Sequence, residues 1–220
     1  MRYLWAAIVA LHILNIPAVW LRYSPDISPL MSLYVAFFGV SGEGKIPTWF
    51  SAIALTVCAI LLAIISGCSF RKRDKYALYW VGLTLTFALM SIDEAIAIHE
   101  LTTAPLRSML NTSGVFYFAW LIPAVTFVGV FGLLYVRFLN YLPRRSCRLF
   151  LGAGAVYLAG VIGMEMIGSA YVSNYGYDLT YGILASIEEI LEMSGIALFI
   201  FALLDYLEKE VTVVSFRLES

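Results

Sequence analysis

Residues 181–206, YGILASIEEILEMSGIALFIFALLDY, decide the fold class. The segment is long and apolar enough for a transmembrane helix, which needs roughly 20 mainly apolar residues. Its first half nevertheless carries three glutamates. Ionisable side chains are costly in a bilayer, so they usually face a protein interior or a water-filled cavity and mark function. The segment therefore predicts a membrane helix that contributes to a polar site.

Five further segments have a similar length and apolar character. We therefore predict an all-α fold, a single transmembrane domain over residues 1–220 with six helices. The composition agrees, because 61% of the residues are hydrophobic and 13% are charged, as in membrane proteins. The first segment lacks a signal-peptide cleavage site, so we expect it to remain as the first helix. The predicted helices span residues 3–21, 49–69, 76–98, 115–138, 149–171 and 181–206.

Basic residues predict the orientation, because cytoplasmic loops of membrane proteins carry an excess of Lys and Arg. Eleven of the fourteen Lys and Arg lie on one side of the predicted helices. Most of them belong to FRKRDK at 70–75 and RFLNYLPRRSCR at 137–148, and Arg2, Lys209 and Arg217 fall on the same side. Both termini are therefore predicted to be cytoplasmic. The external loops are then 22–48, 99–114 and 172–180.

The first external loop contains a second apolar stretch, LMSLYVAFFGV at 30–40. It is too short to cross a bilayer, so we expect an interfacial or re-entrant helix. Pro47 and Thr48 then indicate the start of the next helix. Glu43 lies between these two features. It is either a solvated loop carboxylate or, if the loop folds back, a part of the polar site.

Acidic residues recur at one depth in three predicted helices. Asp93, Glu165 and Glu192 each lie 17 or 18 residues from the nearest basic residue on the cytoplasmic side. At 1.5 Å per residue this distance is roughly 25–27 Å. The hydrocarbon core is about 30 Å thick, so these groups are predicted to form one layer in the outer leaflet.

Eight ionisable side chains are candidates for a shared site in this layer. The outer halves of these helices contain no Lys or Arg, so the carboxylates need protons, a bound cation or contact with the outer water. The helical repeat places the three glutamates of the last helix on one face. His99 joins them only if the third helix ends or bends there. The candidates are Asp93, Glu94, His99, Glu100, Glu165, Glu188, Glu189 and Glu192.

These donors predict a divalent metal ion or a di-metal centre. Carboxylates with an imidazole suit iron, manganese or zinc, and calcium is less favoured. The four-helix di-iron pattern uses Glu-x-x-His on two helices. This chain departs from it, because Ile96 stands three residues before His99 and the last helix has Glu189-x-x-Glu192. The similarity therefore lies in the supply of ligands and not in the motif.

Three functions stay open at this point. The first is a metal-binding membrane protein, an oxidoreductase or a hydrolase acting on a lipid-soluble or periplasmic substrate. The second is a proton- or cation-coupled transporter, which would use the same protonatable carboxylates. The third is a structural or assembly subunit of a membrane complex, with other membrane subunits as partners. The lipid bilayer is the predicted partner in all three, and the net charge of −1 does not indicate nucleic acid.

Other polar and small residues are assigned to packing. His12 and Asn15 share a face of the first helix nearer the cytoplasm, and we expect a hydrogen-bonded packing contact there. Small residues spaced by four, as in Ala155, Ala159 and Gly163, favour close helix approach, and Gly195 suits the same purpose. The three cysteines have no zinc-site spacing and are predicted to be inert thiols.

Three segments together resemble a known family. PTWFS at 47–51, SIDEAIAIHE at 91–100 and SIEEILEMSG at 186–195 are similar, in the same order, to a family of uncharacterised bacterial multi-pass inner-membrane proteins. The resemblance implies a bacterial inner membrane, which makes the outer side periplasmic. It carries no information on the activity.

Overall fold

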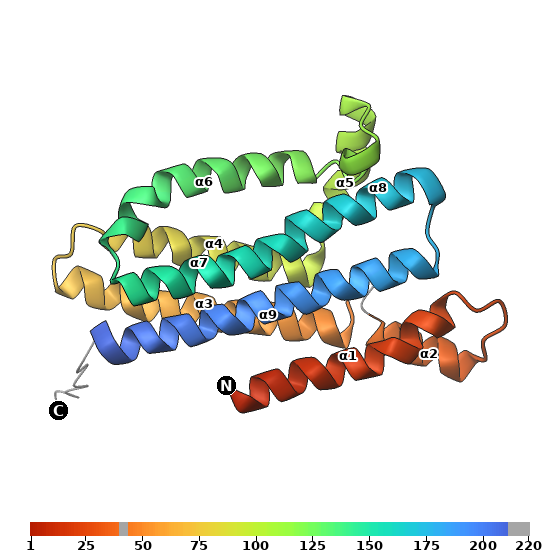
Figure 1. The fold of residues 1–220 in the computed structure, drawn as a ribbon, viewed down its shortest axis with the longest axis horizontal. Coiled ribbons are helices and arrows are strands. Elements are labelled where there is room, and N and C mark those ends of the chain that lie inside the picture. The colour runs from red at the N-terminus through yellow and green to blue at the C-terminus, as the bar shows by residue number, and fades with distance from the viewer. Residues whose placement is uncertain (40–43, 211–220) are drawn as a thin grey trace.

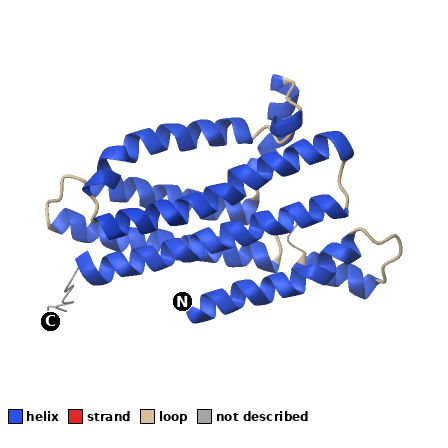
Figure 2. Ribbon diagram, in the orientation of Figure 1, coloured by secondary structure: helices blue, strands red, loops and turns tan. Residues whose placement is uncertain are grey.

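The computed structural model describes residues 1–39 and 44–210, and this part of the chain contains helices and no strands (Figure 2). The prediction of an all-α fold is therefore confirmed for these residues. In chain order the elements are α1 Arg2–Arg22, α2 Pro29–Phe38, α3 Ile46–Arg71, α4 Ala77–Ile96, α5 Ile98–Leu110, η1 Gly114–Phe116, α6 Leu121–Tyr141, α7 Arg144–Leu158, η2 Ala159–Met164, α8 Glu165–Tyr175 and α9 Leu179–Glu210.

Within the described residues, five helical stretches are long and apolar enough to cross a membrane. They are α1, α3, α6, α9 and the continuous run from Arg144 to Tyr175 that α7, η2 and α8 form. Helices α4 and α5 pass the same test together, but the chain bends by 80° between them. The number of candidate spans is therefore five, or six if the bent pair counts as one. Two residues used above, Glu43 and Arg217, lie outside the described residues, as does Val40 at the end of the predicted short helix.

Helices α3, α4, α7 and α9 run alongside one another, and α1 packs along α9 (Figure 1). The α3–α4 and α6–α7 turns lie at the same end of the bundle as the last turn of α9 (Figure 1). An aromatic core fills this end. The fully buried Trp80 ring contacts the rings of Phe138, Phe150 and Tyr206, with centroids 4.9–6.0 Å apart.

Glycine sets the closest helix crossing. A Cβ atom on Gly195 of α9 would lie 2.6 Å from the backbone N of Tyr157 on α7, so a side chain does not fit there. The expectation of close packing at Gly195 is therefore confirmed. The predicted stripe on the fifth span is wrong, because Ala155 and Ala159 are exposed, whereas Ala153 and Gly160 are buried.

Several boundaries differ from the sequence prediction for local reasons. The third span ends at Ile96 because Ala97 takes a left-handed conformation, with φ at 59°. Residues 99–110, expected in a loop, belong to the helix α5, which begins at Ile98. The fourth span begins at Leu121 because Gly114–Phe116 form a separate 3-10 turn. The short helix of the first external loop exists as α2, where the Ser28 hydroxyl accepts a hydrogen bond from the N–H of Met31 at 3.3 Å.

Candidate functional site

A cavity of about 380 Å³ lies at the α5 end of the bundle, away from the aromatic core. Its walls come from α3, α4, α5, α6, α7, η2, α8 and α9. All eight candidates from the sequence line it: Asp93, Glu94, His99, Glu100, Glu165, Glu188, Glu189 and Glu192. The structure therefore brings together side chains from four helices that lie up to about a hundred residues apart in the chain.

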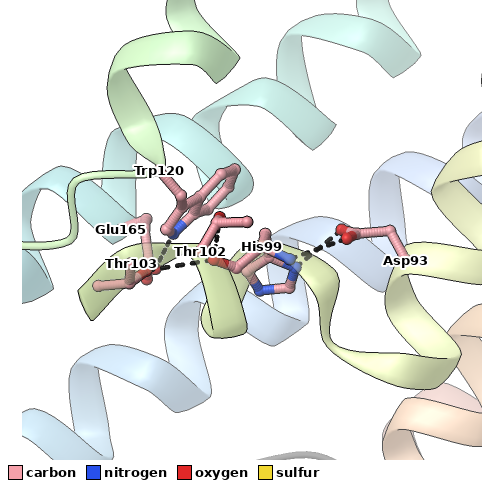
Figure 3. Close-up of polar contacts among 6 residues, drawn as sticks. All are labelled: Asp93, His99, Thr102, Thr103, Trp120 and Glu165. Atoms are coloured by element: carbon pink, nitrogen blue, oxygen red, sulfur yellow. Dashed lines mark hydrogen bonds and ion pairs between the residues drawn. The ribbon is translucent and has the colours of Figure 1, made fainter. Parts of the chain in front are cut away.

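The break between α4 and α5 brings His99 into this wall. The left-handed Ala97 donates its N–H to the Asp93 carbonyl at 2.7 Å, which ends α4. The chain then turns back, and the Asp93 carboxylate accepts from the His99 N–H at 3.0 Å and from its Nδ1 at 2.7 Å (Figure 3). The condition for His99 to join the site, an end or bend of the third helix, is thus met.

The same contact orients the imidazole. An ionised carboxylate only accepts hydrogen bonds, so Nδ1 of His99 carries the proton that points at Asp93. A neutral ring then has its lone pair on Nε2. The His99 ring also lies against Trp120, with centroids 4.7 Å apart, and the His99 carbonyl accepts from Thr102 and Thr103 (Figure 3). Asp93 therefore acts on the site by positioning His99.

Glu165 stands at a distortion of its helix. Residues Ala159–Met164 form a π-helical segment, and Glu165 follows it directly. Such segments are rare and frequently occur at functional sites, because the extra residue per turn redirects the side chains that follow. Glu165 accepts a hydrogen bond from Trp120 Nε1 at 3.1 Å (Figure 3). Counting at a regular helical repeat could not find this change of direction.

Glu165 of α8 and Glu188 of α9 line the same cavity. Two ionised carboxylates in one enclosed space repel each other. A proton or a bound cation between α8 and α9 relieves this repulsion.

Gly160 allows α9 to approach the π-helical segment. A Cβ atom on Gly160 would lie 2.8 Å from Cγ of Glu192 and 3.0 Å from the Glu188 carbonyl oxygen. Glu192 is only 9% exposed, and it has no hydrogen bond to any residue that the structure describes. Buried charged groups are normally paired. Its carboxylate faces the cavity without a protein partner in this part of the chain.

In the described part of the chain, the nearest positive charges lie at the edge of the site. Among the described residues, no Lys or Arg lines the cavity. Lys45, which precedes α3, lies near two of its carboxylates. The pKa of the Lys45 ammonium is lowered to about 8, mainly by burial and further by the charge of Arg22. The carboxylates of Glu189 and Glu100 partly offset this by raising the pKa. Glu43, considered as an addition to the site, lies outside the described residues.

Sequence reasoning missed the aromatic part of the wall. Trp120, Tyr157 and Tyr181 line the cavity and add hydrogen-bond donors to an otherwise acidic surface. Tyr181 precedes Glu188 by seven residues, so both lie on one face of α9, and the sequence could have shown this. The places of Tyr157 and Trp120 in the wall depend on packing between helices, so no periodicity in the sequence indicates them.

The donor types fit a metal ion, but their arrangement does not. Among the described residues, no three His, Cys, Asp or Glu side chains are placed so that they could hold a metal ion. The metal centre therefore stays a prediction.

The two polar residues of α1 stay outside the cavity. The Asn15 amide donates to Ser186 Oγ on α9 at 2.8 Å, and His12 Nδ1 lies 2.8 Å from the carbonyl of Ile8, one turn earlier. Neither residue lines the cavity. The expected hydrogen-bonded packing contact is therefore confirmed for Asn15, whereas the hydrogen bond of His12 stays within its own helix.

Comparison with known proteins gives one match. The profile of a family described as "Domain of unknown function (DUF8692)" matches residues 2–207. No curated protein and no solved structure matches the chain.

Proposed function

The chain belongs to the DUF8692 family, and we propose that it is a proton- or cation-coupled transporter of the bacterial inner membrane. One observation carries the proposal. Seven carboxylic acids and one histidine line a single cavity whose described wall contains no Lys or Arg. Seven negative charges at this proximity repel one another, so the cavity must take up protons or cations. A site that exchanges one for the other couples their movements.

The arrangement of the carboxyl groups supports proton exchange. Glu165, Glu188 and Glu192 line one cavity, and Glu192 has no hydrogen-bond partner in the described structure. A cation that enters beside Glu192 lowers the affinity of the neighbouring carboxyl groups for protons, because the two positive charges repel. Entry of a cation therefore releases a proton.

Two helix irregularities also support transport. The break at Ala97 and the π-helical segment Ala159–Met164 both border the cavity. At membrane depth, irregular backbone is tolerated where it is buried in protein or lines a cavity. Discontinuous helices are typical of substrate and ion sites in secondary transporters.

The basic residues and the family resemblance support the location. The turns that carry FRKRDK and RRSCR lie at the end of the bundle opposite to α5 (Figure 1), whose residues His99 and Glu100 line the cavity. By the excess of positive charge this end is cytoplasmic. The cavity then opens near the periplasmic face.

Proteoliposomes that enclose a pH-sensitive dye test the proposal. Inward gradients of monovalent, divalent and organic cations are applied in turn, and proton movement is recorded. We expect at least one cation to drive proton efflux through the wild type, and Glu192→Gln to abolish it. Glu208→Gln, an exposed position on the same helix outside the cavity, is the matched control and should retain the flux. Wild-type vesicles that respond to no cation, or equal flux in Glu192→Gln, would contradict the proposal.

A metal-binding enzyme is the second candidate, and the Asp93–His99 contact favours it. Histidines that bind metals typically donate their other ring N–H to a carboxylate, as His99 does here. The described side chains would have to converge before three of them could share an ion. Elemental analysis of purified protein separates the candidates. Stoichiometric metal that disappears in both Glu192→Gln and Glu165→Gln favours the metal centre, and metal-free protein with proton flux favours the transporter. A structural subunit would show neither.

A further inference from the structure

A second cavity of about 380 Å³ lies between α4, α6, α7 and α9, nearer the aromatic core. Its wall is formed by aliphatic, aromatic and glycine residues and contains no charged side chain among the described residues. It adjoins the acidic cavity, because five residues line both. These are Phe87, Phe131, Gly154, Tyr157 and Leu158.

Helix α6 forms the outer wall of this apolar cavity. It runs along the side of the bundle (Figure 1), and its apolar side chains Val130, Leu133 and Leu134 are largely exposed. In a bilayer these side chains face lipid tails. A molecule already dissolved in the membrane can therefore reach the apolar cavity from the side, without crossing an aqueous phase.

We propose that the transported cation is a single-chain amphiphile with an amine head group. This inference rests on the proposed function and names its substrate class. The ammonium group lies among the carboxylates of the acidic cavity, and the alkyl chain extends past Tyr157 into the apolar cavity beside α6.

The carboxylic acids of the acidic cavity favour an ammonium head group. Glu192 is buried, faces the cavity and lacks a hydrogen-bond partner in the described structure, so an ammonium group supplies the donor that this carboxylate lacks. The rings of Trp120 and Tyr157 line the same space and can stack on a cation. A phosphate or sulfate head group would meet seven carboxylic acids and, among the described lining residues, no Lys or Arg, and would be repelled.

The size and the position of the two cavities favour a ligand with an alkyl chain. Both cavities fall within the usual range for small-molecule sites, which is roughly 300–1,000 Å³. A polar chamber next to an apolar one fits a molecule with one polar end and one flexible apolar end. A hydrated inorganic cation would leave the apolar chamber unused.

The chain offers a matched pair of variants for the test. Gly132 on α6 lines the apolar cavity, and a Cβ atom there would meet no atom within 4 Å. We therefore expect Gly132→Leu to add bulk at the wall of the apolar cavity without a clash at the new Cβ. Gly129→Leu on the same helix is the control, because its Cβ is equally unobstructed and it lines neither cavity.

Binding is measured by native mass spectrometry of protein in nanodiscs that contain dodecylamine, dodecanol or dodecyl sulfate. We expect one dodecylamine per protein, and little dodecanol or dodecyl sulfate. Gly132→Leu and Glu192→Gln should each weaken dodecylamine binding by about tenfold or more, whereas Gly129→Leu should not. Equal binding of the amine and the alcohol, or unchanged binding in Gly132→Leu, would overturn the inference.

The result separates this inference from the proposed function. If Glu192→Gln abolishes proton flux driven by an inorganic cation while the wild type retains no dodecylamine, the transporter stands and the amphiphile fails. If dodecylamine binding depends on Gly132 and Glu192 while no cation drives flux, the ligand class stands and transport fails.

Discussion

Helix α9 carries two buried acids in opposite surroundings, Asp205 near one end of the bundle and Glu192 near the other. Asp205 accepts hydrogen bonds from Nε and Nη2 of Arg145, both at 3.0 Å, and from Nζ of Lys209 at 2.6 Å. Glu192 faces a cavity whose described wall holds no Lys or Arg. Removing one partner of a buried ion pair is destabilising, because the other charge is left unpaired. We infer that the paired Asp205 belongs to the structural contacts of α9 and that Glu192, which lacks a basic partner in the described structure, belongs to the proposed site.

The two ends of the bundle differ in packing as well. Around Trp80 the helices are joined by interlocked aromatic rings. Around Glu192 the contacts are made by glycine, a π-helical segment and a helix break, and a cavity remains. We infer that the aromatic end maintains the fold while the other end is open to ligands. Five substitutions in four experiments test this contrast, from the largest expected effect to the smallest.

Trp80→Ala should destabilise the protein most. Trp80 is fully buried in the aromatic core, and truncation of a buried Trp costs about 3–5 kcal/mol of unfolding free energy. Leu78→Ala on the same helix is the control, because Leu78 is 72% exposed and should cost little. Denaturant unfolding in detergent micelles measures both. A similar loss of unfolding free energy in the two variants would contradict the inference that the aromatic end maintains the fold.

Gly160→Ala should come next. The added Cβ would lie 3.0 Å from the Glu188 carbonyl oxygen, so α9 must shift, and overpacking of this kind costs about 1–3 kcal/mol. The shift also moves Glu192, so we expect proton flux to fall with stability. Gly163→Ala lies in the same π-helical segment, where the nearest atom to the new Cβ is 4.0 Å away. If Gly163→Ala has the same effect as Gly160→Ala, close approach is not the reason.

Asp205→Asn and Glu192→Gln test the comparison of the two acids directly. Asp205→Asn weakens the contacts with Arg145 and Lys209, so its melting temperature should fall while proton flux is retained. Glu192→Gln removes a buried acid that has no basic partner among the described residues, so its melting temperature should stay the same or rise while flux is lost. Thermal unfolding and the vesicle assay, run on both variants, give the answer. If Asp205→Asn loses flux and Glu192→Gln loses stability instead, Asp205 is the site acid and Glu192 the structural one.

Lys45→Met should have the smallest effect on stability. We expect that effect in the way the unfolding free energy depends on pH. The pKa of Lys45 is about 8 in the folded protein and 10.5 for an ordinary lysine. Between these pH values the unfolded chain holds a proton that the folded chain has lost, so the unfolding free energy rises with pH. Lys45→Met should lack this rise. Unfolding measured from pH 7 to 10.5 tests it, with Lys75→Met as a control that should keep the wild-type slope.

Much of the site was accessible to sequence reasoning because it depends on composition and helix periodicity. Counting from the basic residues placed Asp93, Glu165 and Glu192 at one depth, and all three line the cavity. The orientations of the His99 and Glu165 side chains could not be predicted in this way. One depends on a left-handed Ala97, and the other on a π-helical segment, and neither follows from a regular repeat of 100° per residue.

The sequence by itself determined the helical class, the approximate spans and the set of acids at one depth. Apolar length and helical repeat are local properties, and the bilayer imposes both on any chain that crosses it. The tertiary structure alone decided which acid is paired and which is not. It also decided where Gly160 and Gly195 let helices meet, and that an apolar cavity adjoins the acidic one. These features depend on contacts between residues far apart in the chain, which no local pattern encodes.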